Sequence, residues 1–129
     1  MANTVTTQTL VDGPRNLVLL LTGVLDSSNE SRVIKVDVST FYKTPTKVRV
    51  DTIRHLISAG LIVVLDWDAT TPVRFAALTG YDEVDACRFG GLTNNAGAGI
   101  TGDIFLTTLG YSSGTLAYNI ILEMTKESF

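Results

Sequence analysis

The stretch FGGLTNNAGAGITGD, residues 89–103, decides between two fold classes for this chain. It holds five of the eleven glycines, and residues 97–102 form a G-x-G-x-x-G. That motif binds a dinucleotide where a strand precedes the glycines and a helix follows, because the helix N-terminus holds the pyrophosphate. Here Asn94, Asn95 and Ala96 precede the glycines, and the following DIFL run has strand composition. Asp103 also stands where a P-loop would need lysine. The stretch therefore predicts a long irregular loop between strands, with no phosphate site.

The segments nearest to this loop show the period-two pattern of β-strands. Residues 61–67 place Leu61, Val63, Leu65 and Trp67 on one face, as expected of a central strand. Residues 73–78 and 81–88 are shorter strand patterns, and the second of them is acidic. Residues 103–109 and 117–126 supply two more strands. No segment sustains the 3.6-residue period of a helix.

The first half of the chain continues the strand pattern. Residues 2–11 are rich in threonine and valine and predict an edge strand or an arm lying on a neighbour. Residues 15–25 are apolar on both faces, which predicts a strand buried on both sides. Residues 30–38 alternate: one face carries Ile34, Val36 and Val38, and the other carries Val33, Lys35 and Asp37.

Residues 46–58 change phase along their length. Val48 and Val50 set one face, but the next apolar residues are Ile53 and Ile57. A strand cannot change faces without an extra residue, so we expect a bulge near residues 51–52. A helix over residues 51–59 is the alternative, and its threonine and isoleucine content disfavours it.

Together these segments predict one all-β domain over residues 1–129, with residues 1–12 as the arm or edge strand. About eight to nine short strands, at ~8–14-residue spacing with turn residues between them, are typical of an antiparallel β-sandwich of jelly-roll type.

The composition excludes several classes of protein. Charged residues make up 18% of the chain, and the net charge is −3 with no basic cluster, so nucleic acid is not an expected partner. The longest apolar run, residues 17–25, is too short for a membrane helix, and the N-terminus lacks a signal-peptide pattern. The single cysteine, Cys87, cannot form an intramolecular disulfide. The combination of 45% hydrophobic residues with few charges predicts apolar surface that meets another subunit.

Candidate chemical groups are sparse, and we expect no catalytic residue, metal or cofactor. Asp66 and Asp68 form a D-x-D that could hold Ca²⁺, with further carboxylates at Asp82, Glu83 and Asp85, but solvated strand ends are the favoured explanation. His55 and Cys87 could form a nucleophile pair. The sequence favours a buried thiol and a partly exposed imidazole instead.

Aromatic residues raise the possibility of a sugar-binding module, because exposed aromatic rings on a sandwich can stack on sugars. The candidates are Trp67, Tyr81 and Tyr111. Trp67 lies in phase with Val63 and Leu65 of the same strand, so we expect it in the core.

Three strings in the second half resemble one family. LDWDATTPV at residues 65–73, FGGLTNNAGAGITGDIFLTT at residues 89–108 and YNIILEMTK at residues 118–126 are similar to capsid decoration, or cement, proteins of tailed bacteriophages. The similarity covers residues 17–126. It implies a jelly-roll or related sandwich and a non-enzymatic virion protein on the capsid exterior, assembled in the bacterial cytoplasm. It also implies the major capsid protein as partner and association as a homotrimer.

The residues themselves suggest where a neighbour would be contacted. The longest irregular connection is the loop at residues 89–103, so we predict the contact there, through Phe89, Gly90, Gly91, Asn94, Asn95, Gly97, Gly99 and Asp103. The alternative function is a carbohydrate- or receptor-binding sandwich module of a phage tail.

Overall fold

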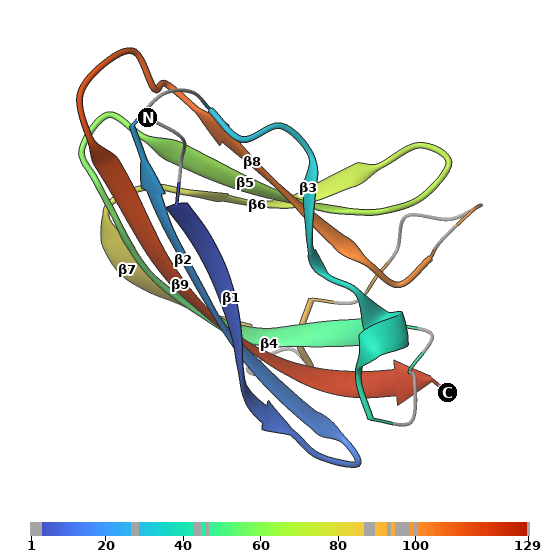
Figure 1. Ribbon diagram of the computed structural model, residues 1–129. Helices are drawn as coiled ribbons and strands as arrows, with labels where there is room; N and C mark the ends of the chain where they lie inside the picture. Colours follow the sequence, from blue (N-terminus) through green and yellow to red (C-terminus); the bar gives the residue numbers. More distant parts are fainter. Residues whose placement is uncertain are drawn as a thin grey trace.

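The computed structural model describes residues 4–26, 29–42, 45, 47–86, 90–92, 94, 99 and 101–128 (Figure 1). The described residues form nine strands in two antiparallel sheets, confirming the predicted all-β sandwich. The strands are β1 (Thr4–Asp12), β2 (Asn16–Leu25), β3 (Val33–Val36), β4 (Lys47–Ile57), β5 (Ile62–Trp67), β6 (Val73–Leu78), β7 (Tyr81–Asp85), β8 (Ile104–Leu109) and β9 (Leu116–Ser128). One 3₁₀ turn, η1 (Val38–Thr40), follows β3.

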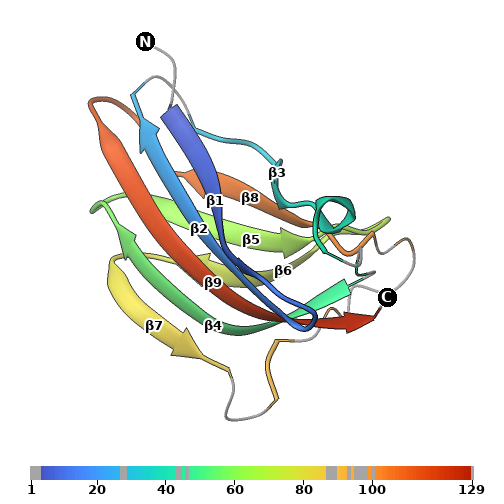
Figure 2. The ribbon, with the colours of Figure 1, turned by 60° about the horizontal axis from the view of Figure 1, so that its bottom comes forward.

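The topology is that of a jelly roll. One sheet has the order β1-β2-β9-β4-β7 and the other β3-β8-β5-β6, and Figure 2 shows the five-stranded sheet in front of the four-stranded one. Four antiparallel pairs are nested in sequence: β2 with β9, β3 with β8, β4 with β7 and β5 with β6. The chain is thus a long hairpin with its tip at β5–β6, rolled into two layers, and β1 is added outside this eight-strand unit.

The core lies between the two layers. Leu17, Leu19 and Leu21 of β2 are fully buried, because alternate residues of a strand point to one face. Trp67 is 1% exposed and stacks on Phe75 with ring centroids 4.1 Å apart, which confirms its predicted place in the core. Burial of each large apolar side chain contributes about 1.5–3 kcal/mol relative to exposure.

The predicted bulge in the fourth strand is confirmed. The pairing of β4 with β9 shifts register between Val50 and Thr52. The shift places Ile53, His55 and Ile57 on the inner face. His55 is therefore buried, 5% exposed, with Nδ1 3.2 Å from the Gly80 carbonyl oxygen, so the expectation of a partly exposed imidazole was wrong.

Two further expectations need correction. The strand predicted over residues 30–38 is reduced to β3, because its pairing with β8 is irregular between Ile34 and Val36. Ile34 consequently faces outward with 47% exposed, whereas Lys35 is buried. The strand β2 is buried on one face only: Val18, Leu20 and Val24 lie on the outer face, half-buried or exposed, because no layer of the described residues covers that side.

Candidate interaction surfaces

The first part of the predicted contact loop is anchored to β4. Leu92 exchanges two backbone hydrogen bonds with Val50, of 2.7 and 3.0 Å. Gly91 has φ +91°, and a Cβ there would meet the Arg49 side chain, so its glycine is needed for this close packing. Gly90 is exposed with open space around it, and Asn94 is buried.

The end of the loop is anchored to the rim of the other sheet. Asp103 accepts a hydrogen bond from the Val38 N–H at 3.0 Å, and its carbonyl accepts one from the Asp68 N–H. Burial, together with the nearby charges of Asp37 and Asp68, raises the pKa of Asp103 despite the Val38 bond. Gly99 is exposed, but a Cβ there would collide with Thr70.

The described residues of the loop thus divide into anchored positions and exposed ones; Gly99 is exposed but packs against Thr70. Gly91, Asn94 and Asp103 hold the loop to the sandwich, whereas Gly90 forms a corner with open space around it. Three of the predicted contact residues, Phe89, Asn95 and Gly97, lie outside the described part of the chain. The cysteine, Cys87, also lies outside it. Contact of this loop with a neighbour stays a prediction.

The carboxylates considered for Ca²⁺ have protein partners. Asp66 pairs with Arg74 at 3.3 Å, and Asp68 accepts a 2.6 Å hydrogen bond from the Thr101 hydroxyl. Among the described residues, no three His, Cys, Asp or Glu side chains are grouped so that they could hold a metal ion. Within the same ranges, no helix is long and apolar enough to cross a membrane.

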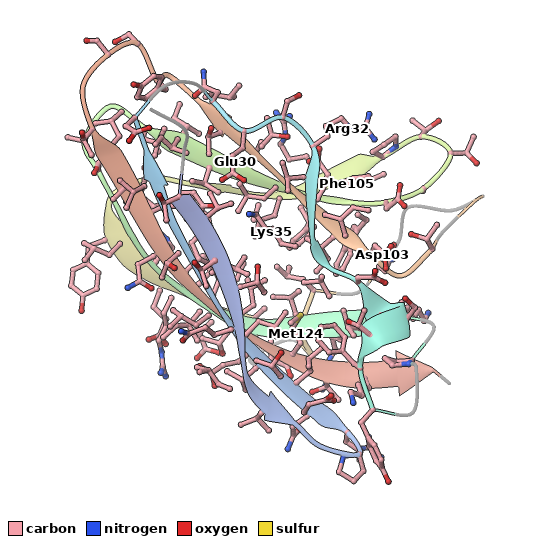
Figure 3. All side chains as sticks on the ribbon, in the orientation of Figure 1. Glu30, Arg32, Lys35, Asp103, Phe105 and Met124 are labelled. Carbon is pink, nitrogen blue, oxygen red and sulfur yellow. The ribbon has the colours of Figure 1, made fainter. Side chains whose placement is uncertain are left out.

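A charged cluster that the sequence did not reveal lies between the sheets. Lys35 Nζ is 3.0 Å from Glu30 Oε2, and both side chains are almost fully buried. The Tyr118 hydroxyl donates to the other carboxylate oxygen of Glu30. Burial, followed by the hydrogen bond and charge of Glu30, raises the pKa of Tyr118. Figure 3 shows Glu30 and Lys35 pointing into the space between the layers. Each charged group has a partner inside the cluster, so the cluster offers no open site.

A second buried cation, the ammonium of Lys126, links the last strand to the turn between β1 and β2. Lys126 of β9 is 2% exposed, and its ammonium donates to Asp12 at 2.6 Å and to the Gly13 and Tyr42 carbonyl oxygens at 2.8 Å. Burial acts to raise the pKa of Asp12, but the hydrogen bonds from Lys126 and the Tyr42 N–H, with the Lys126 charge, lower it. This lysine therefore fixes the turn between β1 and β2.

The strand β1 is the most exposed element of regular structure. All nine of its residues are exposed, although it pairs with β2 along its length. The four-stranded sheet does not extend over β1, so both faces of this strand meet solvent. The edge of β1 away from β2 is unpaired among the described residues, in agreement with the predicted edge strand or arm.

The other sheet edges carry features that hinder strand addition, and residues 4–9 of β1 lack them. Charged side chains, shortness and inward-pointing charges all protect edges. The edge strand β7 reads YDEVD, β3 has four residues with Lys35 turned inward, and β6 carries Arg74 after Pro72. In β1, the register shifts between Thr9 and Val11 and Asp12 is charged, but residues 4–9 hold no charge, no proline and no bulge. The edge of β1 is therefore open to another strand.

The jelly-roll architecture defines the class of protein as a β-sandwich with a free edge strand. Beyond this class, the chain matches no protein-family model, no curated protein and no solved structure.

Sequence reasoning missed the buried Lys35 and Lys126. For Lys126 a signal was present, because the residue continues the alternation of Tyr118, Ile120, Leu122 and Met124 on the inner face of the last strand. For Lys35 the signal was local: it stands between Ile34 and Val36, and a single bulge is enough to turn it inward. The buried position of Lys126 depends on register with the β1–β2 turn, which is more than 100 residues away in sequence.

Proposed function

We propose that this chain is a non-enzymatic structural protein of a tailed-bacteriophage virion, which decorates and stabilises the exterior of the capsid. The resemblance of residues 65–73, 89–108 and 118–126 to decoration proteins suggests this role. Its partners are the major capsid protein and further copies of the chain, associated as a homotrimer. Assembly takes place in the bacterial cytoplasm.

The observation that carries the proposal is the open edge of β1. Strand addition to such an edge gives affinity through main-chain hydrogen bonds, and side chains on the two faces supply specificity. The inner face of β1, formed by Val5, Thr7 and Thr9, lies beyond the four-stranded sheet and adds uncovered surface next to that edge. A neighbour that pairs with β1 covers both the open edge and the inner face of this strand.

A weak contact between each copy and the capsid is sufficient, because the contact is repeated over the shell. A decoration protein occupies many equivalent positions on one shell, so small interface energies are summed over the particle. The chain needs no catalytic group for this work. The buried charged groups at Glu30 and at Lys126 are paired within the β-sandwich.

The test is the addition of purified protein to undecorated capsids of the encoding phage, followed by measurement of their disruption temperature. We expect the temperature to rise with the native chain. The double substitution Thr7→Lys and Thr9→Lys should abolish the rise, because charge on an edge strand hinders pairing. Both threonines are exposed, so the fold should be retained.

The matched control is Thr71→Lys, an equally simple change at an exposed residue of the β5–β6 loop. It should stabilise capsids as the native chain does. No binding of the native chain at micromolar concentration would overturn the proposal. Full activity of the double-lysine variant would instead remove β1 from the contact.

A further inference from the structure

The outer face of the five-stranded sheet carries a continuous row of uncharged side chains. Register pairs Thr6 with Thr22, Thr22 with Asn119, Asn119 with Leu56, and Leu56 with Tyr81. Directly paired residues lie on the same face, so these five side chains form one line across all five strands. With strands about 4.8 Å apart, the line is about 19 Å long.

A trough follows this row. Its volume is about 420 Å³, within the range of small-molecule sites. One side is formed by Thr4 and Thr6 of β1, and the other by Leu56 and Ser58 at the end of β4. A smaller hollow of about 160 Å³ shares Leu56 and Asn119 with the trough and continues it to Tyr81.

The chemistry of the trough is neutral and mixed. No charged side chain of the described residues lines it. The hydroxyls of Thr6 and Thr22 and the amide of Asn119 make no hydrogen bond with other described residues, so they can serve a ligand. Leu56, 58% exposed, supplies an apolar patch.

An exposed aromatic ring stands at the end of the row. Tyr81 is 84% exposed, the highest value among the large hydrophobic side chains of the described ranges. Nothing in the described sandwich packs on most of its ring, whereas Trp67, another candidate for sugar stacking, is buried in the core. Arg54 also lines the smaller hollow beside Tyr81, and its guanidinium is paired there with Glu83 at 3.1 Å and Glu123 at 3.5 Å.

We propose that this trough binds a neutral linear oligosaccharide, laid across the strands from Thr6 to Tyr81. A sugar ring carries hydroxyls around its rim and C–H groups on its faces. The threonine hydroxyls and the Asn119 amide match the rim, while Leu56 and the Tyr81 ring match the faces. The described residues that line the larger trough carry no charge, and Arg54 at the smaller hollow is already paired with Glu83 and Glu123, which disfavours phosphates and acidic ligands. The length of the row fits several sugar units rather than one.

This site is separate from the contact proposed for β1. Thr7 and Thr9 are paired with Leu21 and Leu19, whose side chains are buried in the core, so they lie on the opposite face of β1 from Thr6. A strand added at the edge of β1 lies in the plane of the sheet and leaves the trough open. Failure of capsid binding would therefore not remove sugar binding, and the reverse also holds.

The test is an NMR titration of the ¹⁵N-labelled full chain with cellohexaose, maltohexaose and N-acetylchitohexaose. We expect saturable shifts of residues in the trough with at least one of them. Tyr81→Ala should weaken that binding about two- to tenfold, the range expected for one aromatic contact, and Tyr81→Phe should restore it.

Leu56→Ala and Leu109→Ala form a matched pair, because both leucines are exposed on outer faces but Leu109 belongs to the other sheet. Only Leu56→Ala should weaken binding. The proposal is overturned if no probe shifts the trough at millimolar concentration, or if an acidic oligosaccharide such as a heparin hexasaccharide binds more tightly. Chemical-shift changes in the trough that depend on protein concentration alone, without added sugar, would identify a second copy of the chain as the occupant. That result would also overturn the proposal.

Discussion

Tyr118 lies with its ring against the backbone of Gly23, and its hydroxyl donates to Glu30 between the sheets. A Cβ at position 23 would collide with the edge of the Tyr118 ring. The ring cannot move away without breaking its bond to Glu30, whose carboxylate also holds Lys35. The glycine is thus required by close packing rather than by its backbone angles.

Gly23→Ala should therefore destabilise the chain by about 1–3 kcal/mol, the usual cost of overpacking a core. Equilibrium unfolding in urea measures the change. Gly13→Ala is the control, because a Cβ there meets only the Asn16 carbonyl oxygen, at 3.7 Å, and should alter stability by less than about 0.5 kcal/mol. Combining Gly23→Ala with Tyr118→Leu should recover part of the loss specific to the clash. Strict additivity of the two changes would show that the ring is not the obstacle.

At the scale of elements, Lys126 joins three segments. It holds Asp12 and Gly13 at the β1–β2 turn and Tyr42 after η1, and the residue itself belongs to β9. Loss of the lysine leaves a partly buried carboxylate and two carbonyl groups without this donor. The position of the open strand β1 therefore depends on a charge at the far end of the chain.

Lys126→Met should lower the free energy of unfolding by about 2–3 kcal/mol at neutral pH. This is the magnitude of hydrogen bonds to a charged group at a partly buried site. The folded pKa of Asp12 is lowered, so its contribution is present above its unfolded value near 3.8 and is lost as the pH falls through the folded pKa. The difference between native chain and variant should accordingly shrink in acid. Unfolding curves at a series of pH values test both expectations.

Arg54→Met is the matched control, because Arg54 forms exposed ion pairs with Glu83 and Glu123 and should cost at most about 1 kcal/mol. An equal loss of unfolding free energy in Arg54→Met and Lys126→Met would contradict a larger stabilising contribution from Lys126.

The elements also show what the sequence could predict. Strand periodicity identified the core face of β5, with Val63, Leu65 and Trp67, because alternation reports burial directly. The phase change between Val50 and Ile53 revealed the β4 bulge for the same reason. The edge position of β1 followed from its threonine-rich, weakly apolar composition.

Properties that depend on register between distant strands could not be predicted. The row from Thr6 to Tyr81 joins residues of five strands, and each position in it is set by pairing rather than by local letters. Lys35 was assigned to the face opposite Ile34 and Val36, because the bulge in β3 leaves no change of phase as clear as that in β4. Tyr81 was recognised as a candidate aromatic, but only the fold placed it in line with Asn119.

At the scale of the whole molecule, the edges determine how copies can assemble. Two copies that pair β1 with β1 form a closed two-fold dimer, because each strand then meets its own equivalent. A closed trimer needs a different contact, in which β1 of one copy meets another surface of the next. The proposed homotrimer therefore requires β1 to bind somewhere other than β1.

Light scattering of the purified chain distinguishes these arrangements. We expect a mass about three times the 13.9 kDa of one chain, and a return to one chain in the Thr7→Lys, Thr9→Lys variant, since charge on the edge blocks strand addition. Thr71→Lys should keep the native mass. A mass of two chains would contradict the trimer and indicate pairing of β1 with β1, because that contact closes after two copies. A trimer that survives both lysines would place the contact elsewhere, and the exposed corner of the loop at Gly90 is then the next surface to substitute, with Gly90→Asp.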